Sequence, residues 1–281
     1  MSLPSNEFRL GIFVLCILFS GTLCSFAIEA DDLPAKADFH IFLLAGQSNM
    51  AGRGNIEPHH QKIHPRVLVL DQNGNWIPAQ HPLHWDKPRL VGVGLGKSFA
   101  ESLVEADPDV TIGLVPAACG GSPISAWLPG AFFEPTKSHP YDDAINRAHQ
   151  ALKDGTLKGI LWHQGEADSK ADRAAHYQQK LEELIRRFRD DLGAPDVPFL
   201  IGQLGRFPPN PWDEYKELVD QAQQAIASAD PRSAFIPSTD LTARDRNHFD
   251  ADSYVEFGRR YAKAYLALSR DLPLRVQPLE P

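Results

Sequence analysis

The feature that most constrains this chain is an apolar segment followed by a polar turn, because this order occurs four times along the chain. The first copy is residues 39–45, followed by the turn 46–49 (GQSN). Apolar runs of this length predict buried strands. Three later segments show the same order, at 110–117, 158–162 and 234–237. In an open α/β sheet, ligands bind beyond the carboxyl ends of the strands, so these turns indicate one functional rim.

Helical periodicity fills the intervals between the apolar segments. Strands alternating with helices predict an α/β fold, with a mostly parallel sheet and helices on both faces. We find no internal repeat or linker, so residues 31–281 are expected to form one domain. Asp172 is expected to cap the longest helix. The predicted strands are 39–45, 66–70, 110–117, 158–162, 197–204 and 234–237, with a short extended piece at 76–78, and the predicted helices are 95–106, 141–152, 172–192, 213–229 and 253–268.

The composition is that of an ordinary globular protein and argues against one class of partner. The chain has 281 residues, of which 43% are hydrophobic and 23% are charged. That is enough for one α/β domain with a sizeable core. The net charge of −8 and the absence of a Lys/Arg-rich run argue against a nucleic-acid partner.

The first 27 residues predict a signal peptide. Arg9 gives a weakly positive start, and residues 11–23 (GIFVLCILFSGTL) form an apolar stretch that is short for a membrane span. Small residues place the cleavage after Ala27, with Ala30 as the second choice. A retained membrane anchor is the competing interpretation. We therefore expect a secreted or periplasmic protein with no stable membrane association after cleavage.

Cleavage would leave one cysteine in the mature chain. Cys16 and Cys24 lie in the predicted signal peptide, and Cys119 follows it. A mature chain with one cysteine has no internal disulfide, despite its predicted export. Cys119 is expected to be a small packing residue rather than a nucleophile.

Ser48 is the candidate nucleophile, since it lies in the turn directly after the first apolar segment. A serine hydroxyl needs a base to take its proton, and the base needs a third group that holds its tautomer. Asp245 and His248 supply both groups, because the two residues between them let a turn bring the carboxylate to Nδ1 and leave Nε2 for Ser48. A solvated turn is the alternative interpretation of this Asp-x-x-His segment, and its pairing with Ser48 favours catalysis.

Acyl transfer also needs hydrogen-bond donors for an oxyanion. Gly120 and Gly121 follow the segment 110–117 and can expose backbone N–H groups that bulkier residues would hinder. Gln164 follows the segment 158–162 and carries a side-chain amide donor. For Gly120 and Gly121, the alternative interpretation is an ordinary glycine turn. For Gln164, it is a polar residue at a strand end whose hydrogen bonds are made within the protein.

Two other patterns suggest different chemistry and are weaker. His59, His60 and His64 lie in one loop, but no matching carboxylate or cysteine cluster accompanies them, so exposed loop histidines are the better interpretation. The segment 92–96 (GVGLG) resembles a dinucleotide-binding glycine loop. It does not follow a strand, and we expect it to begin a helix.

Aromatic side chains near the expected rim are candidates for sugar stacking. Trp85 shares a Pro- and His-rich loop with His81 and His84, and Trp127 follows the Gly120 turn. Either tryptophan would suit a wall of a carbohydrate site. Packing in the core is the alternative interpretation for each.

Four segments together are similar to the motif blocks of the SGNH hydrolase superfamily. They are 46–49 (GQSN), 119–124 (CGGSPI), 162–166 (WHQGE) and 245–248 (DRNH), in that order. More specifically they resemble carbohydrate esterase family 6, also described as the sialate O-acetylesterase-like domain, over roughly residues 38–268. The resemblance implies a three-layer α/β/α sandwich with a mostly parallel sheet of about five strands, flavodoxin-like in order.

The resemblance implies roles for the candidate catalytic residues. Ser48 would be the nucleophile, His248 the general base and then the acid, and Asp245 the group that orients His248. The oxyanion hole would combine the Ser48 N–H, the N–H of Gly120 or Gly121, and the Gln164 side chain. Other SGNH enzymes place Asn where this branch has Gln164.

Further residues of the same blocks are expected to support the site. These are Asn49, His163 and Glu166, with Trp85 and Trp127 as substrate-lining candidates. We expect Glu166 to fix its loop. The resemblance implies neither a metal nor an organic cofactor.

The implied function is a secreted serine esterase that removes O-acetyl groups from carbohydrate through an acetyl-serine intermediate. Its partner would be an acetylated oligo- or polysaccharide, and acetylxylan esterase-like and sialate O-acetylesterase-like activities both fit. One alternative is an SGNH esterase on non-sugar esters, and another is a non-catalytic carbohydrate-binding module on the same fold. A binding module has no need of Ser48, Asp245 and His248 together. A long apolar stretch near the site would favour non-sugar esters, but the loops are instead rich in Pro, His, Trp and Asn. Both observations favour the carbohydrate esterase.

Overall fold

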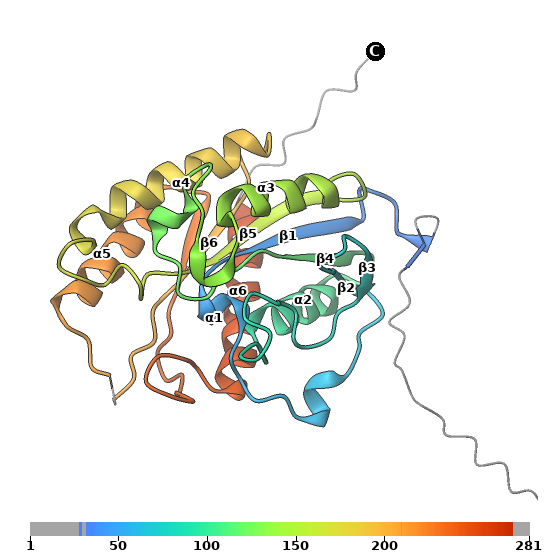
Figure 1. The fold of residues 1–281 in the computed structure, drawn as a ribbon. Helices are drawn as coiled ribbons and strands as arrows, with labels where there is room; N and C mark the ends of the chain where they lie inside the picture. Colours follow the sequence, from blue (N-terminus) through green and yellow to red (C-terminus); the bar gives the residue numbers. More distant parts are fainter. Residues whose placement is uncertain (1–27, 30–31, 209, 272–281) are drawn as a thin grey trace, which may run out of the picture.

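A seven-stranded sheet organises the molecule (Figure 1). We describe residues 28–29, 32–208 and 210–271 of a computed structural model. The strand order is β3–β2–β4–β1–β5–β6–β7, and every neighbouring pair is parallel except the antiparallel pair β2–β3. The strands are β1 (Phe39–Gly46), β2 (Val67–Leu70), β3 (Trp76–Pro78), β4 (Thr111–Pro116), β5 (Thr156–His163), β6 (Phe199–Gly202) and β7 (Ser233–Ile236).

Helices cover both faces of this sheet, which gives the three-layer α/β/α arrangement that the sequence predicts (Figure 1). One face carries α3, α4 and α5, and the other carries α2 and α6, which pack on each other. A short helix, α1, follows β1 directly. The helices are α1 (Ser48–Ala51), α2 (Leu95–Ala106), α3 (Pro140–Ala151), α4 (Tyr177–Asp191), α5 (Glu214–Ala229) and α6 (Ala251–Asp271).

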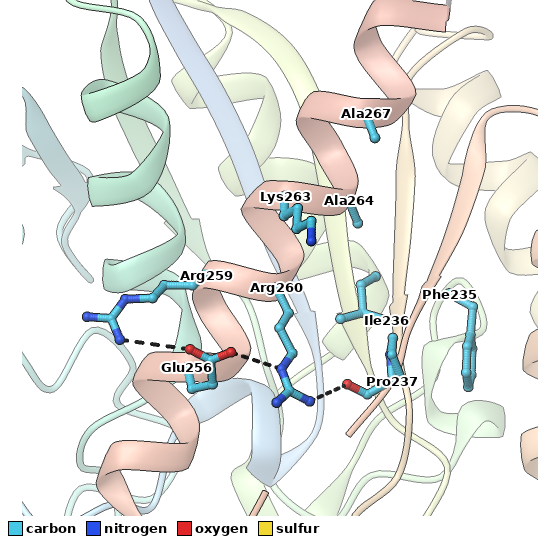
Figure 2. Close-up of a pocket in the computed structure, with 9 residues that line it drawn as sticks. All are labelled: Phe235, Ile236, Pro237, Glu256, Arg259, Arg260, Lys263, Ala264 and Ala267. Atoms are coloured by element: carbon cyan, nitrogen blue, oxygen red, sulfur yellow. Dashed lines mark hydrogen bonds and ion pairs between the residues drawn. The ribbon is translucent and has the colours of Figure 1, made fainter. Parts of the chain in front are cut away.

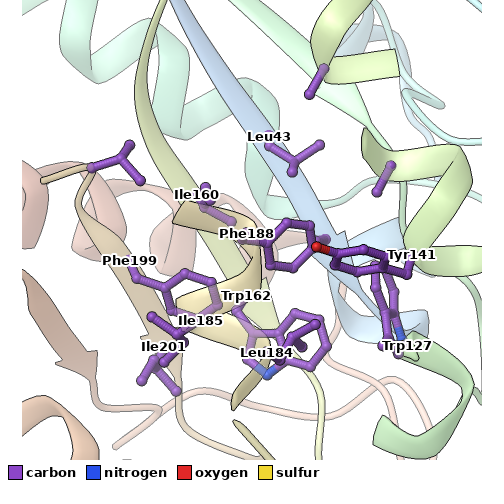
Figure 3. Packing of buried hydrophobic residues seen from close by; sticks show 14 of the residues in the cluster. Leu43, Trp127, Tyr141, Ile160, Trp162, Leu184, Ile185, Phe188, Phe199 and Ile201 are labelled. Atoms are coloured by element: carbon purple, nitrogen blue, oxygen red, sulfur yellow. The ribbon is translucent and has the colours of Figure 1, made fainter. Parts of the chain in front are cut away.

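The central strand β1 divides the core into two halves. Its alternate side chains point to opposite faces, as the pleat of a strand requires. Leu43 joins the cluster under α3, α4 and α5, where Trp127, Trp162 and Phe188 are fully buried (Figure 3). Phe42 joins the cluster under α2 and α6. Burying both faces of parallel strands explains why the strand segments are continuous apolar runs.

Local signals set the ends of several helices. Pro140 occupies the first turn of α3, where its missing N–H costs nothing. The Asp213 carboxylate accepts from Lys216 N–H at 2.9 Å and caps α5. The prediction that Asp172 caps the helix expected at 172–192 is wrong, because that helix, α4, begins at Tyr177 after a separate 3-10 turn. The Asp172 carboxylate instead lies 3.4 Å from Arg173 Nε.

The strand count exceeds the five that the family resemblance implies. The six strand segments predicted from the sequence are present, and the extended piece at 76–78 becomes β3 by pairing with β2. Residues 1–27, the predicted signal peptide, lie outside the described residues. Within the described part of the chain, no helix combines the length and the apolarity that crossing a bilayer requires.

Candidate active site

Ser48 is positioned by the tight end of β1. Gly46 has a φ of +132°, and a Cβ there would lie 2.2 Å from the backbone oxygen of His163 on β5. Only glycine can adopt this φ, and lie this close to the neighbouring backbone, without strain. Gln47 N–H donates to the same His163 oxygen at 2.9 Å, and α1 begins at the next residue. Ser48 is therefore held at the first position of a helix, where it is 9% exposed.

The His248 ring faces Ser48 across the rim of the sheet. Its Nε2 lies 3.1 Å from Ser48 Oγ, although the two residues are 200 positions apart in the sequence. On the other side of the ring, Nδ1 lies 3.0 Å and 2.9 Å from the two carboxylate oxygens of Asp245. The three candidate catalytic residues thus form a hydrogen-bonded series of carboxylate, imidazole and hydroxyl. A serine nucleophile is activated by this arrangement.

Asp245 sets the tautomer of the His248 ring. An ionised carboxylate can only accept, so Nδ1 carries the hydrogen and Nε2 keeps its lone pair for the Ser48 hydroxyl. Burial alone would raise the pKa of Asp245. Hydrogen bonds from the Asn247 and His248 N–H groups and from the His248 ring outweigh burial and lower that pKa below its ordinary value. The orienting group is therefore charged at neutral pH.

Asn49 joins the segments that carry the candidate catalytic residues. Its Nδ2 donates to Glu166 Oε1 at 2.5 Å and to the backbone oxygen of Asn247 at 3.0 Å, and its Oδ1 accepts from the Tyr254 hydroxyl at 2.6 Å. Asn49 is fully buried. One side chain thus ties α1 to the loop after β5, to the His248 loop and to α6. Glu166 contacts this network and also lines the hollow beside Ser48.

The turn after β4 brings two glycines to the same hollow. Ser122 N–H donates to the Cys119 oxygen at 3.1 Å, and Gly121 has a φ of +83°, as the third position of a type II turn requires. Gly120 N–H donates to Asp86 Oδ2 at 2.7 Å. Among the described residues, Gly121 N–H has no acceptor, so it is the free donor of the pair.

The structure does not support Gln164 as an oxyanion donor. Its side chain is fully buried, and Nε2 donates to the Ser122 oxygen at 3.1 Å and to Asp168 Oδ2 at 2.6 Å. Both N–H groups of the amide therefore have acceptors inside the protein. Burial raises the pKa of Asp168, although hydrogen bonds from Gln164 and from Ile124 N–H oppose that rise. Through these two hydrogen bonds, Gln164 links the end of the Gly120–Gly121 turn, at Ser122, to Asp168 in the loop after β5.

His163 also lies behind the site rather than in it. The ring is fully buried, with Nε2 3.1 Å from the Gln203 oxygen, and it packs roughly perpendicular to the Phe249 and Phe257 rings. Burial lowers its pKa. Neutral and enclosed, His163 supports the Ser48 turn through its backbone oxygen and does not reach substrate.

The hollow beside Ser48 has a volume of about 380 Å³. It combines candidate catalytic residues with cationic side chains from three loops. The residues that line it include Ser48, His248, Gly120, Gly121, Glu166, Arg53, Lys87 and Lys170.

The two tryptophans proposed as substrate-lining residues are placed elsewhere. Trp127 is fully buried, donates to Ser122 Oγ at 3.0 Å and packs edge-on against Trp162, so the sugar-stacking prediction for Trp127 is wrong. Trp85 lies under the Arg147 guanidinium, 4.5 Å from the ring centroid, and lines a separate small hollow. Its neighbours His81 and His84 are buried, and burial lowers their pKa values to about 3 and about 4.

Cys119 is a packing residue. It is buried at the end of β4, and burial raises the pKa of its thiol to about 11. A thiol with that pKa is almost entirely protonated at neutral pH and is a poor nucleophile.

The loop histidines acquire a carboxylate from α6 that the sequence pattern does not show. His59, His60 and Asp252 place ligand atoms within 4.8 Å of one another. His60 is buried, not exposed as expected, and its Nδ1 accepts from Glu57 N–H at 3.0 Å. The lone pair of Nδ1 is thus used, and the neutral ring carries its hydrogen on Nε2. In this arrangement His60 offers no free ring lone pair, so His59 and Asp252 are the members of the group whose ligand atoms remain available.

The glycine-rich segment 92–96 begins a helix, as expected. α2 starts at Leu95, and Gly54 and Val93 form an isolated antiparallel bridge. A Cβ at Gly92 would lie 2.0 Å from the Gly54 oxygen. These glycines permit backbone packing beside the Ser48 segment and do not form a dinucleotide loop.

A larger hollow of about 550 Å³ lies between α6 and β7 (Figure 2). Ile236 and Ala264 form part of its wall, and Lys263 and Arg259 lie along its edge. Glu256 pairs with Arg260, whose Nη1 also donates to the Pro237 oxygen. None of the candidate catalytic residues lines it.

Two side chains at the site were not predicted from the sequence. Arg53 and Asp86 form an ion pair at 2.7 Å with side chains 4% and 2% exposed, and Asp86 holds the Gly120 N–H. The polar run that contains Ser48 ends at Arg53, which is the only sequence signal for it. Asp86 lies in a loop without regular periodicity, so its pairing could not be predicted.

The fold and the site define a hydrolase with a Ser–His–Asp arrangement at the rim of a parallel α/β sheet. The chain matches the family model described as "carbohydrate esterase, sialic acid-specific acetylesterase" over residues 38–267. It therefore belongs to this family of carbohydrate esterases, and it is a carboxylic ester hydrolase.

A plant relative agrees with this assignment, and solved structures share the fold. The chain is 32% identical over 248 residues to the probable carbohydrate esterase At4g34215 of Arabidopsis thaliana, covering 81% of this chain and 90% of the relative. The solved structure of that Arabidopsis protein matches with a TM-score of 0.72 and 29% identity, over 83% of this chain and 99% of that one. XAC1771, a carbohydrate acetylesterase from Xanthomonas citri, shares the fold with a TM-score of 0.65 and 22% identity, over 83% of this chain and 57% of that one.

Proposed function

We propose that this protein is an exported serine esterase that removes O-acetyl groups from carbohydrate through an acetyl-serine intermediate. The observation that carries the proposal is the hydrogen-bonded series from Asp245 through His248 to Ser48, which opens into a hollow. Membership of the carbohydrate esterase family supports an ester bond as the target.

The residues would act in two half-reactions. Ser48 Oγ attacks the acetyl carbonyl carbon while His248 Nε2 takes the hydroxyl proton, and Asp245 stabilises the imidazolium. The imidazolium then gives its proton to the sugar oxygen, and the bond between that oxygen and the acetyl carbon breaks, which releases the sugar as an alcohol and leaves the acetyl group on Ser48. Water attacks the acetyl-serine with His248 again as the base, and acetate leaves as Ser48 recovers its proton.

The negative charge on the carbonyl oxygen would be met by backbone N–H groups. Ser48 N–H lies at the first position of α1, where an N–H has no acceptor within the helix. Gly121 N–H is the second donor, because Asp86 already holds the Gly120 N–H. Donors of this kind act where charge develops in the transition state.

Acetylated oligo- and polysaccharides are the substrates that the relatives favour. The family description names a sialic acid-specific acetylesterase, and the Xanthomonas protein is named a carbohydrate acetylesterase. Acetylxylan and acetylated sialic acids are therefore the first substrates to compare. Export rests on the predicted signal peptide at residues 1–27 and places the enzyme in the periplasm or outside the cell.

Acetate release tests the proposal. Residues 28–281 and their Ser48→Ala variant are compared on p-nitrophenyl acetate, acetylated xylan and O-acetylated sialic acids, with circular dichroism as the folding control. We expect release by the unmodified chain and a loss of about 10⁴-fold or more in the variant. Faster cleavage of long-chain or aryl esters than of sugar acetates would favour a non-sugar esterase. No cleavage of any ester, with retained sugar binding, would favour a non-catalytic module.

A further inference from the structure

A buried ion pair lies at the wall of the Ser48 hollow, where Arg53 is one of the lining residues. Arg53 Nη2 and Asp86 Oδ2 are 2.7 Å apart, and the two side chains are 4% and 2% exposed. Arg53 Nη1 also donates to the Gly52 oxygen at 2.8 Å. Charges this deeply buried persist only with a partner and satisfied hydrogen bonds. The catalytic series of Asp245, His248 and Ser48 does not use this pair, so its presence needs another explanation.

The pair holds the turn that carries the free oxyanion donor. Asp86 Oδ2 accepts from Arg53 and from Gly120 N–H, both at 2.7 Å. A Cβ at Gly120 would lie 2.5 Å from Arg53 Nη2 and 2.5 Å from Asp86 Oδ2, so the glycine backbone lies directly against the pair. With its first N–H held this way, the turn leaves the Gly121 N–H without an acceptor.

Arg53 also connects the other two parts of the site. It follows α1, which begins with Ser48, by two residues. Its backbone oxygen accepts from the Arg244 guanidinium, next to Asp245 in the His248 loop. Three segments distant in sequence, which carry the nucleophile, the oxyanion donors and the base, therefore meet at one arginine.

The geometry points to Arg53 and Asp86 as positioning residues for acyl transfer. Asp86 fixes the Gly120 N–H, and this fixes the direction of the next N–H, on Gly121, relative to Ser48. Arg53 holds the Asp86 carboxylate in place and relates the turn to the Ser48 helix. The inference rests on the proposed esterase function, and it assigns the pair a role in the transition state rather than in ground-state binding.

The effect of such a role differs from that of a merely structural ion pair. Loss of positioning weakens interactions with a tetrahedral oxyanion and leaves contacts with a planar carbonyl unchanged. A displacement of about 1 Å in a catalytic group can cost about 10²-fold in rate. Loss of a structural pair lowers stability and leaves the turnover of the folded fraction unchanged.

The test uses residues 28–281 with three variants. Asp86→Ala removes the acceptor of the Gly120 N–H. The double variant Arg53→Met with Asp86→Leu removes both charges together, so no unpaired charge remains buried if the single variant fails to fold. Asp230→Ala is the matched control, because it breaks the Arg189–Asp230 ion pair, at 2.8 Å, away from the Ser48 hollow.

Three quantities are measured on the folded fraction of each variant. They are kcat/KM for p-nitrophenyl acetate, the inhibition constant of an aryl trifluoromethyl ketone, and that of p-nitroacetanilide. The ketone forms a tetrahedral oxyanion on serine, whereas the anilide keeps a planar carbonyl. We expect both Asp86 variants to lose about 10–100-fold in kcat/KM and in ketone affinity, with anilide affinity within about threefold.

The outcomes separate the inference from the proposed function. An unmodified chain that cleaves no ester would overturn the proposed function. An active unmodified chain whose Asp86 variants keep kcat/KM within threefold would overturn the inference alone. The inference is also wrong if Asp230→Ala loses as much activity as Asp86→Ala, or if anilide affinity falls as far as ketone affinity.

Discussion

The hollow at Ser48 and the hollow between α6 and β7 differ in construction more than in size. The α6–β7 hollow is larger, about 550 Å³ against about 380 Å³. Two of its three cations, Arg259 and Lys263, are exposed side chains on one helix, and the third, Arg260, is half-buried and paired with Glu256 (Figure 2). The Ser48 hollow is built on polar groups that are buried and paired, such as Asn49 with Glu166 and Arg53 with Asp86. Fixed polar groups, rather than volume, indicate where the chemistry takes place.

The two hollows differ in how far their polar side chains must reorganise before they can stabilise a charge. A surface lysine must lose rotamer freedom and water before it can hold a charge in place. A buried hydrogen-bonded group has already lost both during folding, so it costs nothing further at the moment of reaction. Substitutions at the Ser48 rim should therefore change turnover strongly, and substitutions at the α6–β7 hollow should not.

Among variants that keep both Ser48 and His248, the largest effect is expected for Asp245→Asn. The amide can donate as well as accept, so it no longer holds the His248 tautomer or stabilises the imidazolium, and kcat should fall by about 10²–10⁴-fold. Steady-state kinetics on p-nitrophenyl acetate measure this fall. A loss below tenfold in the folded variant would show that His248 does not depend on Asp245.

Gly120→Ala should have the next largest effect. Its Cβ would lie 2.5 Å from both members of the Arg53–Asp86 pair, so the pair or the turn must shift and the geometry around Gly121 N–H changes. We expect a fall of about 10–10²-fold in kcat/KM. Gly193→Ala is the control, because its Cβ meets no atom within 4 Å and only its φ of +60° is strained. Gly193→Ala should lose stability without losing kcat/KM.

The lowered pKa of Asp245 predicts a pH-dependent contribution to stability. Because the folded pKa lies below the ordinary value of 3.8, this carboxylate stabilises the fold above that value, and the contribution disappears as the pH falls through the folded pKa. The side chain is 47% exposed, so the effect is small. The melting temperature of the unmodified chain should exceed that of Asp245→Asn at pH 6, and the gap should narrow toward pH 3. A gap that widens on acidification would contradict this assignment.

The smallest effect is expected at the α6–β7 hollow. Lys263→Ala and Arg259→Ala change exposed side chains that contact no candidate catalytic residue. Their kcat/KM values on p-nitrophenyl acetate and on acetylated xylan should stay within about twofold, as for most surface substitutions. A selective loss on the polysaccharide would show that this hollow takes part in substrate binding and would break the contrast between the two regions.

The strands and helices were largely predictable from local patterns. Parallel strands buried on both faces are continuous apolar runs, and amphipathic helices repeat their apolar residues every three or four positions. The edge strand β3 was predicted only as an extended piece, since three residues have too little pattern to show their partner. Asp172 was mistaken for a helix cap because a 3-10 turn precedes α4.

The sequence by itself determined the sheet, the turns at its rim, and the catalytic candidates Ser48, Asp245 and His248. A strand end, a glycine and a short Asp-x-x-His spacing are local, so they appear in the linear order. Only the tertiary structure decided that Trp127 is buried, that Gln164 is engaged with Asp168, and that Arg53 and Asp86 hold the Gly120 turn. Arg53, Asp86 and Gly120 lie in segments that are distant in sequence, and the burial of Trp127 and Gln164 is set by the packing around them. Which buried polar group finds which partner therefore depends on tertiary packing that no local pattern encodes.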